Sequence, residues 1–279
     1  MFYQALLYLL APFVLLGLLL HVLLGLAVAL VIFPPLSQEV RNRIIQIWSR
    51  MVLRIVGVRL VAPKNPAAWS RRGCIAAANH ISWLDILVLN ASATMRFIAK
   101  AEIARWPLAG WLVSSVGTLY IERGRRHAVH ALNRAVRERL QAGETIGIFP
   151  EGTTSDGSLL LPFHANLLQP ALDTGAEIRP VALRYSQLGQ RSRAAAYVGD
   201  DSLAQSLWWI ITAPHLTAEA FWLPALPADI TNRHAAGRAL RAAIGDALAL
   251  SGDAQRVKGD AVEAKDSGGD AATPSRTIA

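Results

Sequence analysis

The chain has 279 residues, enough for one sizeable domain with appendages. Its 53% hydrophobic content calls for a search for membrane segments, and its single cysteine excludes an internal disulfide and metal sites built from several cysteines. The formal net charge of +8 favours an anionic partner, such as nucleic acid, anionic lipid headgroups or a phosphorylated substrate.

The first 38 residues form a candidate membrane anchor, because they contain no Lys, Arg, Asp or Glu. The run from Phe2 to Phe33 is almost wholly apolar, and about 20 residues of helix span a bilayer. We predict a transmembrane anchor over residues 1–38, either as one tilted span or as a hairpin bent near Pro12 or Gly17. A signal peptide is the alternative, but no basic residue precedes the apolar run.

Residues 39–57 have the pattern of a basic amphipathic helix at a membrane surface. Arg43, Arg50 and Arg54 are expected on one face, and apolar side chains recur at helical spacing on another. These apolar residues are Ile44, Ile45, Ile47, Trp48, Met51, Val52 and Ile55. An ordinary domain helix with a solvated face would normally carry charges of both signs. Residues 41–72 hold eight basic residues and no acidic one, which predicts that the following domain lies on the cytoplasmic side.

The body of the chain, residues 58–250, alternates short apolar runs with helical patterns, so we predict an α/β domain layered around a mixed central sheet. Strands are expected at Val58–Ala62, Cys74–Ala78, Arg96–Ala99, Thr118–Glu122, Thr145–Phe149, Arg179–Tyr185, Ala194–Val198 and Leu216–Trp222. Helices are expected at Trp83–Ala91, Ile103–Val116, His127–Ala142, Ala165–Thr174, Leu203–Thr212 and Asn232–Leu250. Residues 251–279 have little apolar content and are predicted to be a disordered tail.

The first candidate site is the stretch from Asn79 to Asp85, between an expected strand and an expected helix, where ligands of α/β sheets usually bind. His80 can act there as a general base near neutral pH. Asp85 can fix its tautomer if His80 lies in the loop and Asp85 in the first helical turn. The alternative is that Asn79 or Ser82 merely caps the helix and Asp85 complements the helix dipole.

Two further polar stretches follow expected strands. In the stretch from Phe149 to Gly157, Gly152 permits a close backbone approach, and the polar residues can donate hydrogen bonds. In the stretch from Gly117 to Arg123, an arginine at a strand end can bind two phosphate oxygens. Taken singly, the first can be a plain turn and the second a solvated run of charges.

Together and in this order, the motifs resemble those of the glycerolipid acyltransferase family, the lysophospholipid acyltransferases that include 1-acylglycerol-3-phosphate acyltransferase. The family pattern is Asn-His-x4-Asp, Gly-x-x-Phe/Tyr-Ile-x-Arg, Phe-Pro-Glu-Gly-Thr and a Pro-Val/Ile pair on a strand. The matching residues are His80 with Asp85, Gly117 with Tyr120 and Arg123, Phe149 to Thr153, and Pro180 with Val181. The resemblance covers roughly Ile44 to Leu226.

The resemblance implies a membrane-bound O-acyltransferase of phospholipid biosynthesis, with its catalytic domain on the cytoplasmic side of the inner membrane. His80, oriented by Asp85, would deprotonate the free hydroxyl of a lysophospholipid, and the alkoxide would attack the thioester of acyl-CoA or an acyl carrier protein. Neither a metal ion nor a cofactor is implied. The implied residues of the acceptor site are Lys100, Arg123, Glu151, Gly152 and Thr153, with Lys100 and Arg123 holding the phosphate.

Two departures from the family pattern leave the acceptor open. Thr154 stands where many members that form phosphatidic acid have arginine, and His164 stands where many have lysine. The stretch from Glu151 to Gly157 also resembles the branch that acylates lyso-ornithine lipid, an acceptor without a phosphate. From the resemblance to the family as a whole we expect 1-acyl-sn-glycerol-3-phosphate as the acceptor. Because of the two departures, lyso-ornithine lipid is the alternative.

Two other classes of function fit less well. A nucleic-acid-binding membrane protein would suit the charge, but the chain has no basic and aromatic module that reads bases, so no nucleic-acid partner is expected. An inactive scaffold in lipid metabolism would not need His80, Asp85 and Glu151, and all three are present.

Overall fold

The computed structural model describes residues 2–63, 73–106, 109–121 and 126–250. Within these residues the strands are β1 Arg59–Val61, β2 Cys74–Ala78, β3 Arg96–Lys100, β4 Leu119–Ile121, β5 Thr145–Ile148, β6 Glu177–Gln187, β7 Gln190–Arg191 and β8 Leu216–Trp222. The helices are α1 Phe2–Ala27, α2 Gln38–Ile55, α3 Leu84–Ser92, α4 Ala109–Ser115, α5 Arg126–Gln141, α6 Gln169–Thr174, α7 Leu203–Thr212 and α8 Arg233–Ala247.

The strands form a mixed sheet in the order β1-β8-β6-β2-β5-β3-β4, with β7 paired to β6. β6 runs antiparallel to β7 and β8, and the other neighbouring pairs are parallel. Every residue of β2 is buried, which explains its continuous apolar sequence Cys-Ile-Ala-Ala-Ala. The predicted fold class, an α/β domain layered around a mixed central sheet, is confirmed.

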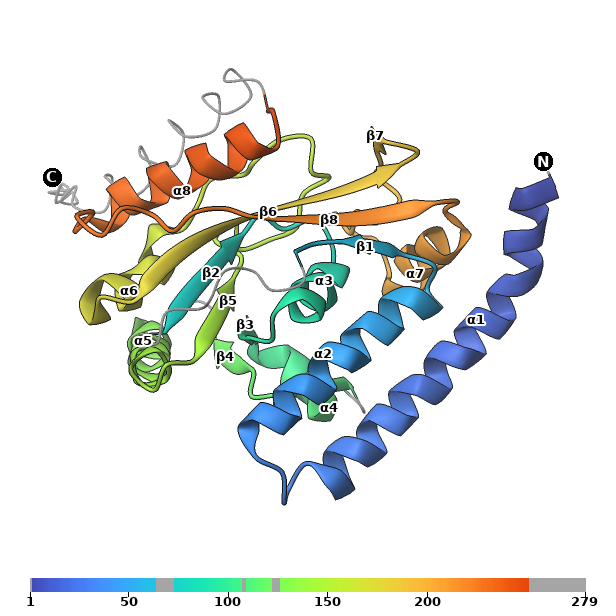
Figure 1. Cartoon of the computed structure of the whole chain (residues 1–279), viewed down its shortest axis with the longest axis horizontal. Helices are drawn as coiled ribbons and strands as arrows, with labels where there is room; N and C mark the ends of the chain where they lie inside the picture. Colours follow the sequence, from blue (N-terminus) through green and yellow to red (C-terminus); the bar gives the residue numbers. More distant parts are fainter. Residues whose placement is uncertain (1, 64–72, 107–108, 122–125, 251–279) are drawn as a thin grey trace, which may run out of the picture.

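Helices cover both faces of the sheet (Figure 1). Helices α2, α3 and α7 lie over one face, and α5, α6 and α8 lie over the other. Side chains along β6 alternate between the two apolar cores, since successive residues of a strand point to opposite faces. Val181, Leu183 and Tyr185 belong to the core on the α3 side, whereas Ala182 belongs to the core on the α8 side.

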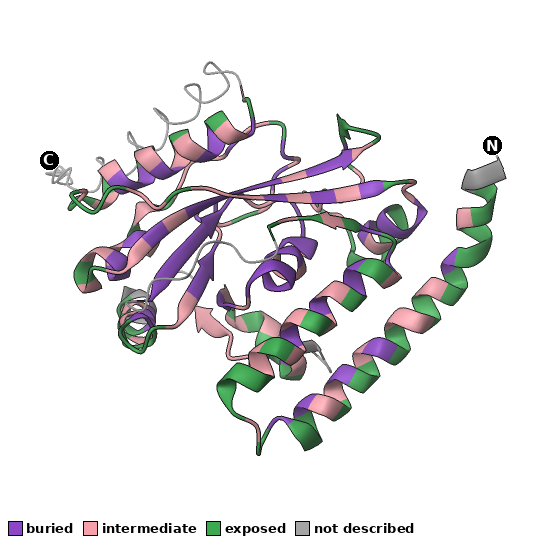
Figure 2. Cartoon of the chain, in the orientation of Figure 1, coloured by how far each residue is buried: buried purple, intermediate pink, exposed green. Residues whose placement is uncertain are grey.

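Helix α1 is continuous through Pro12 and Gly17, so the hairpin alternative was wrong. A proline removes one helical N–H, but strong helix formers, mostly leucines, follow and precede it, and the helix continues. The stretch Ala5–Ile32, which includes a π-helical turn at Val28–Ile32, is long and apolar enough to cross a bilayer. Most of its leucines are exposed, and exposed and intermediate residues predominate along α1 (Figure 2).

The domain contacts α1 along much of its length, since Ala11 is buried in the core and Val14 and Leu18 pack against it. Near its start, the Tyr8 ring stacks on Trp208 of α7 with ring centroids 5.9 Å apart. Further along, the His21 ring stacks on Trp48 of α2 at 5.3 Å. Gly25 permits this approach, because a Cβ there would lie 2.7 Å from the Trp48 ring nitrogen. Helix α1 therefore lies along the domain (Figure 1).

Helix α2 packs Leu53 into the core on the α3 side of the domain, whereas Ile45 packs with Ala29 and Phe33 in a separate small cluster. Arg50 was expected on the basic face of a helix at a membrane surface, but it donates from Nε to the carbonyl of Ala91 at 2.7 Å, near the end of α3. A cation there satisfies a carbonyl left free at the helix C-terminus. Ile47, expected on the apolar face, is 55% exposed, so part of that face is not covered by the domain.

Two predicted elements were wrong. The expected helix Ile103–Val116 is a 3-10 segment, Ala101–Arg105, followed by α4; the sequence between them contains Pro107, which cannot donate a helical hydrogen bond. The expected strand Ala194–Val198 is instead a turn at Ala194 and Ala195 followed by irregular backbone, in which the Tyr197 N–H donates to the Ile81 carbonyl at 3.0 Å. Strand β7, which forms a short hairpin with β6, was not predicted. The predicted tail, residues 251–279, lies outside the described residues.

Candidate active site

The sequence motifs converge because four parallel strands end at the same edge of the sheet. Strands β2, β5, β3 and β4 are neighbours in that order and run parallel. The stretch that contains His80 follows β2, the stretch that contains Glu151 follows β5, and Lys100 ends β3. Arg123 comes two residues after the end of β4 and lies outside the described residues, so its predicted role in phosphate binding stays a prediction.

His80 and Asp85 are in direct contact. Nδ1 of His80 lies 2.8 Å from Oδ2 of Asp85, with His80 in the loop and Asp85 in the first turn of α3. The same oxygen accepts the N–H groups of Ile81 at 2.7 Å and Ser82 at 2.9 Å. The Asp85 carboxylate is fully buried, whereas the His80 side chain is 19% exposed. The geometry is the one required for an oriented base. The N-cap of α3 is Trp83, with no side-chain cap hydrogen bond, rather than Asn79 or Ser82 as the alternative proposed.

The ring of His80 is held from several sides. It stacks on Phe149, with ring centroids 3.9 Å apart and an interplanar angle of 10°. The backbone carbonyl of His80 accepts the N–H of Ser155 at 2.8 Å, which ties the loop after β2 to the loop after β5. Asn79 exchanges two hydrogen bonds with the backbone of Leu183 on β6, at 3.0 and 2.7 Å. These contacts restrict the ring to one orientation. Little conformational entropy is therefore lost when the ring reaches its position in the transition state.

Glu151 holds the backbone around the site. Oε1 accepts the N–H of His80 at 2.8 Å, and Oε2 accepts the N–H of Leu161 at 2.9 Å. The residue is only 3% exposed. Burial raises the pKa of Glu151 to about 7, aided by the charge of Asp85 and opposed by the two backbone N–H groups and Arg241. Glu151 therefore joins two loops at the site, and its predicted role in shaping the acceptor site stays a prediction.

The residues after Glu151 form a tight turn. Gly152 has φ = +68°, and a Cβ there would lie 3.0 Å from the exposed His164 ring, which accounts for glycine at this position. Thr153 is exposed. The hydroxyl of Thr154 donates to the carbonyl of Tyr197, so the residue in place of the usual arginine stabilises a loop. Thr154 and His164, the two positions that depart from the family pattern, thus hold neither arginine nor lysine.

The glycine of the second motif makes room for a buried arginine. Gly117 has φ = +81°, and a Cβ there would lie 3.0 Å from the Arg96 side chain. Arg96 donates to the Val116 carbonyl and, at 3.0 Å, to Glu144. These bonds hold the turn that leads into β4. Lys100 is exposed and pairs in register with Ile121, the last residue of β4, so it lies at the edge where the segment containing Arg123 begins.

Two residues at the site were not predicted from the sequence. The hydroxyl of Tyr185, near the C-terminal end of β6, donates to Oδ1 of Asp85 at 2.7 Å, although the two residues are 100 positions apart. Arg241, on α8, donates to the Leu160 carbonyl at 2.8 Å, next to Leu161, and its charge acts on Glu151. No local pattern signals either contact, because both depend on how β6 and α8 pack against the loops.

Comparisons with known proteins agree with this geometry. The profile of the Acyltransferase family matches residues 58–184. The chain is 42% identical over 180 residues to the 1-acyl-sn-glycerol-3-phosphate acyltransferase of Neisseria meningitidis serogroup B, covering 64% of this chain and 70% of that protein. It is 36% identical over 187 residues to the lyso-ornithine lipid O-acyltransferase of Pseudomonas aeruginosa, covering 67% and 69%.

The fold also matches a solved structure. The crystal structure of the 1-acyl-sn-glycerophosphate acyltransferase PlsC from Thermotoga maritima aligns with a TM-score of 0.62 over 88% of this chain and 93% of that one, at 19% identity. The TM-score and the extent of the alignment indicate a common fold. From its sequence relatives, its fold and the ordered motifs at the sheet edge, the chain belongs to the acyltransferase family.

Proposed function

We propose that this protein transfers a fatty acyl group from acyl-CoA or an acyl carrier protein to the free hydroxyl of a lysophospholipid, namely 1-acyl-sn-glycerol-3-phosphate, to form phosphatidic acid. The observation that carries the proposal is the 2.8 Å contact between His80 Nδ1 and a fully buried Asp85 carboxylate. With Nδ1 donating to Asp85, Nε2 is the ring nitrogen that can accept a proton.

The proposed reaction needs one proton relay and no cofactor. His80 takes the proton of the acceptor hydroxyl as the hydroxyl oxygen attacks the thioester carbonyl, and the Asp85 carboxylate stabilises the resulting imidazolium. When the tetrahedral intermediate collapses, the C–S bond breaks and the imidazolium gives its proton to the departing thiolate. The products are an ester and a free thiol, and His80 returns to its starting state.

Lyso-ornithine lipid is the second candidate acceptor. Thr154 supports it, because this residue binds the Tyr197 carbonyl where many phosphatidic-acid-forming relatives offer a cation to phosphate. The relative from Pseudomonas aeruginosa, named a lyso-ornithine lipid O-acyltransferase, also matches over about the same length as the relative from Neisseria meningitidis. Lys100 and Arg123 are the cations that we propose for the phosphate of a lysophosphatidic acid acceptor.

A paired assay tests the proposal. We expect purified protein with radiolabelled acyl-CoA, or with acyl carrier protein carrying the label, to produce labelled phosphatidic acid from 1-acyl-sn-glycerol-3-phosphate. The competing acceptor, lyso-ornithine lipid, is offered in a parallel reaction at the same concentration. Product from lyso-ornithine lipid alone would replace the first candidate by the second, and product from neither acceptor with either donor would overturn both.

We also propose that α1 attaches the protein to the inner membrane with the catalytic domain on the cytoplasmic side. The support is the uncharged stretch Ala5–Ile32 with its exposed leucines, and the absence of acidic residues among residues 41–72 beside it. Trp208 and Trp209 of α7 are 40% and 42% exposed next to α1, which suits side chains at the lipid–water interface. Because the domain contacts α1 near Tyr8 and near His21, a crossing of the bilayer by α1 requires these contacts to open.

Charges placed on the exposed side of α1 are expected to release the protein from membranes. Leu16 and Leu20 are 54% and 57% exposed, so Leu16→Glu and Leu20→Glu leave the fold intact while each weakens lipid binding by about one to two orders of magnitude. Vesicle flotation at low anionic lipid content measures the effect. Leu188→Glu, in the exposed turn between β6 and β7, is the matched control. If the variant that carries both Leu16→Glu and Leu20→Glu floats at the wild-type level, the proposed attachment is contradicted.

A further inference from the structure

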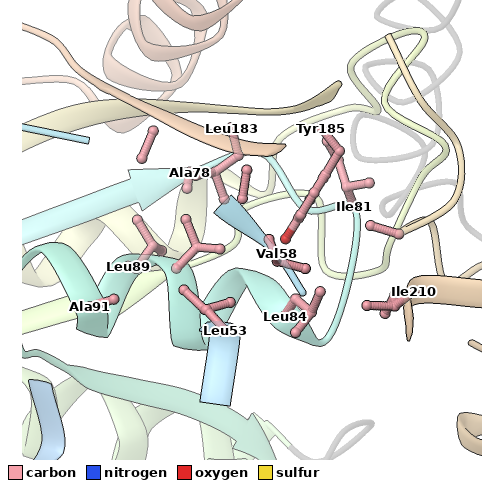
Figure 3. Packing of buried hydrophobic residues seen from close by; sticks show 14 of the residues in the cluster. Leu53, Val58, Ala78, Ile81, Leu84, Leu89, Ala91, Leu183, Tyr185 and Ile210 are labelled. Atoms are coloured by element: carbon pink, nitrogen blue, oxygen red, sulfur yellow. The ribbon is translucent and has the colours of Figure 1, made fainter. Parts of the chain in front are cut away.

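We infer that Tyr185 is a positioning residue for acyl transfer, which holds the Asp85 carboxylate and, through it, the His80 ring. The inference rests on the proposed function of the His80–Asp85 pair and adds a third member that acts only through Asp85. Figure 3 shows the Tyr185 side chain reaching from β6 into the core beside Ile81 and Leu84.

The hydrogen bonds of Asp85 are divided between its two oxygens. Oδ2 contacts His80 Nδ1 and accepts the N–H groups of Ile81 and Ser82. Oδ1 accepts the Tyr185 hydroxyl at 2.7 Å, the one donor to this atom among the described residues. Each carboxylate oxygen has about two acceptor positions, so Oδ2 is fully used and Tyr185 supplies a donor to Oδ1. Tyr185 therefore completes the set that keeps a fully buried carboxylate fixed.

Tyr185 reaches Asp85 because β6 extends beyond β2. Pairing between these strands ends at Ala78 and Val181, whereas β6 continues to Gln187. The extension passes beside the loop that carries His80, where Asn79 already binds the backbone of Leu183. Tyr185 is two residues further along and therefore on the same face of the strand as Leu183. Strand β6 thus holds the loop at its first residue and, through Tyr185, at Asp85.

Packing alone does not account for a tyrosine at this position. Its ring belongs to the apolar core with Leu84 and Leu183, and a phenylalanine would provide the same apolar contacts. The hydroxyl is buried with the ring, and a buried hydroxyl is unfavourable unless it is hydrogen bonded. Burial, together with the charge of Asp85, raises the pKa of Tyr185 well above its ordinary value, so the hydroxyl keeps its proton and stays a donor.

Loss of this hydroxyl is expected to slow turnover without weakening substrate binding. In Tyr185→Phe, Oδ1 of Asp85 has no donor, so the carboxylate can turn about its Cβ–Cγ bond and the contact with His80 Nδ1 loosens. The acceptor does not touch Tyr185, since the ring is only 2% exposed. We expect kcat to fall about 10- to 100-fold, the effect of one hydrogen bond to a charged group, and KM to stay within about two-fold of wild type.

The decisive experiment is a double-mutant cycle on purified full-length protein in lipid vesicles. It compares wild type, Tyr185→Phe, Asp85→Asn and the double variant, with labelled acyl donor and long incubations for the slow variants. Because Tyr185 acts through Asp85, Tyr185→Phe should change kcat by less than about two-fold in the Asp85→Asn background. An equal loss in both backgrounds would overturn the inference, since the hydroxyl would then act independently of Asp85.

The matched control is Ser186→Ala, which removes a buried hydroxyl from the next residue of β6. Ser186 donates to Glu219 at 3.0 Å on the opposite face of the strand, so kcat should stay at the wild-type level. A comparable loss of kcat in Ser186→Ala would mean that any disturbance of β6 slows the enzyme, and it would overturn the inference. If the wild type is active and Tyr185→Phe turns over equally fast, the inference about Tyr185 is wrong but the proposed function stands. If the wild type is inactive with every acceptor and donor, the proposed function is wrong as well.

Discussion

His80→Ala is expected to lower kcat for acyl transfer by about 10² to 10⁴-fold, the usual contribution of a positioned general base. The substitution removes the ring that contacts Asp85 at 2.8 Å and leaves the acceptor hydroxyl without a partner for its proton. KM for the acyl donor should change little, because the imidazole acts mainly in the transition state. Transfer of label from acyl-CoA to the lipid product measures the loss.

The control for this variant is His130→Ala. His130 is an exposed histidine on α5, outside the loops that form the site, and its removal should leave kcat unchanged. Vesicle flotation and thermal unfolding of His80→Ala should match wild type, because the ring is partly exposed and its backbone bond to Glu151 is retained. Near-normal turnover by His80→Ala would contradict its role as the base.

Glu151→Gln is expected to remove a pH dependence of stability that the wild type has between about pH 4.5 and 7. Burial raises the pKa of Glu151 to about 7, so the folded protein favours the neutral carboxyl group. The contribution of Glu151 to the free energy of unfolding is therefore fully present below the pKa that Glu151 has in the unfolded chain. It is lost as the pH rises through the pKa that Glu151 has in the folded protein. A shift of this size corresponds to roughly 3 kcal/mol of unfolding free energy, and glutamine cannot titrate.

Chemical denaturation of wild type and variant at several pH values between 5 and 8 measures this difference. Glu219→Gln is the matched control, because Arg184 lowers the pKa of Glu219, and its contribution changes only at more acidic pH. Parallel pH profiles for Glu151→Gln and wild type would show that the carboxyl group does not titrate in this range.

The same variant is expected to lower kcat at least about ten-fold. Both oxygens of Glu151 accept backbone N–H groups, so the amide NH₂ of glutamine must face either His80 N or Leu161 N, donor against donor. The loop that carries His80 then shifts relative to the acceptor. Full activity of Glu151→Gln would show that the two loops do not need this link.

The sequence predicted the strands that carry the site more accurately than the segments between them. Strand β2 was predicted at its observed limits because a buried parallel strand is a continuous apolar run, and α7 was likewise predicted at its observed limits. The segment Ala194–Val198 was misread as a strand, because small apolar residues there pack beneath the His80 loop without pairing with the sheet. Local pattern does not distinguish such a buried turn from a short strand.

Residue types and their order along the chain determined the family, the sheet class, the apolar N-terminal helix and the pairing of His80 with Asp85, because these depend on local pattern and spacing. Only the tertiary structure decided that Glu151 joins two loops and that Tyr185 holds Asp85. Both contacts join residues far apart in the chain, and they arise from strand order and from how far β6 extends past β2. Sequence spacing carries no information on such distances, so the contacts that support the proposed base become visible only when the strands are assembled.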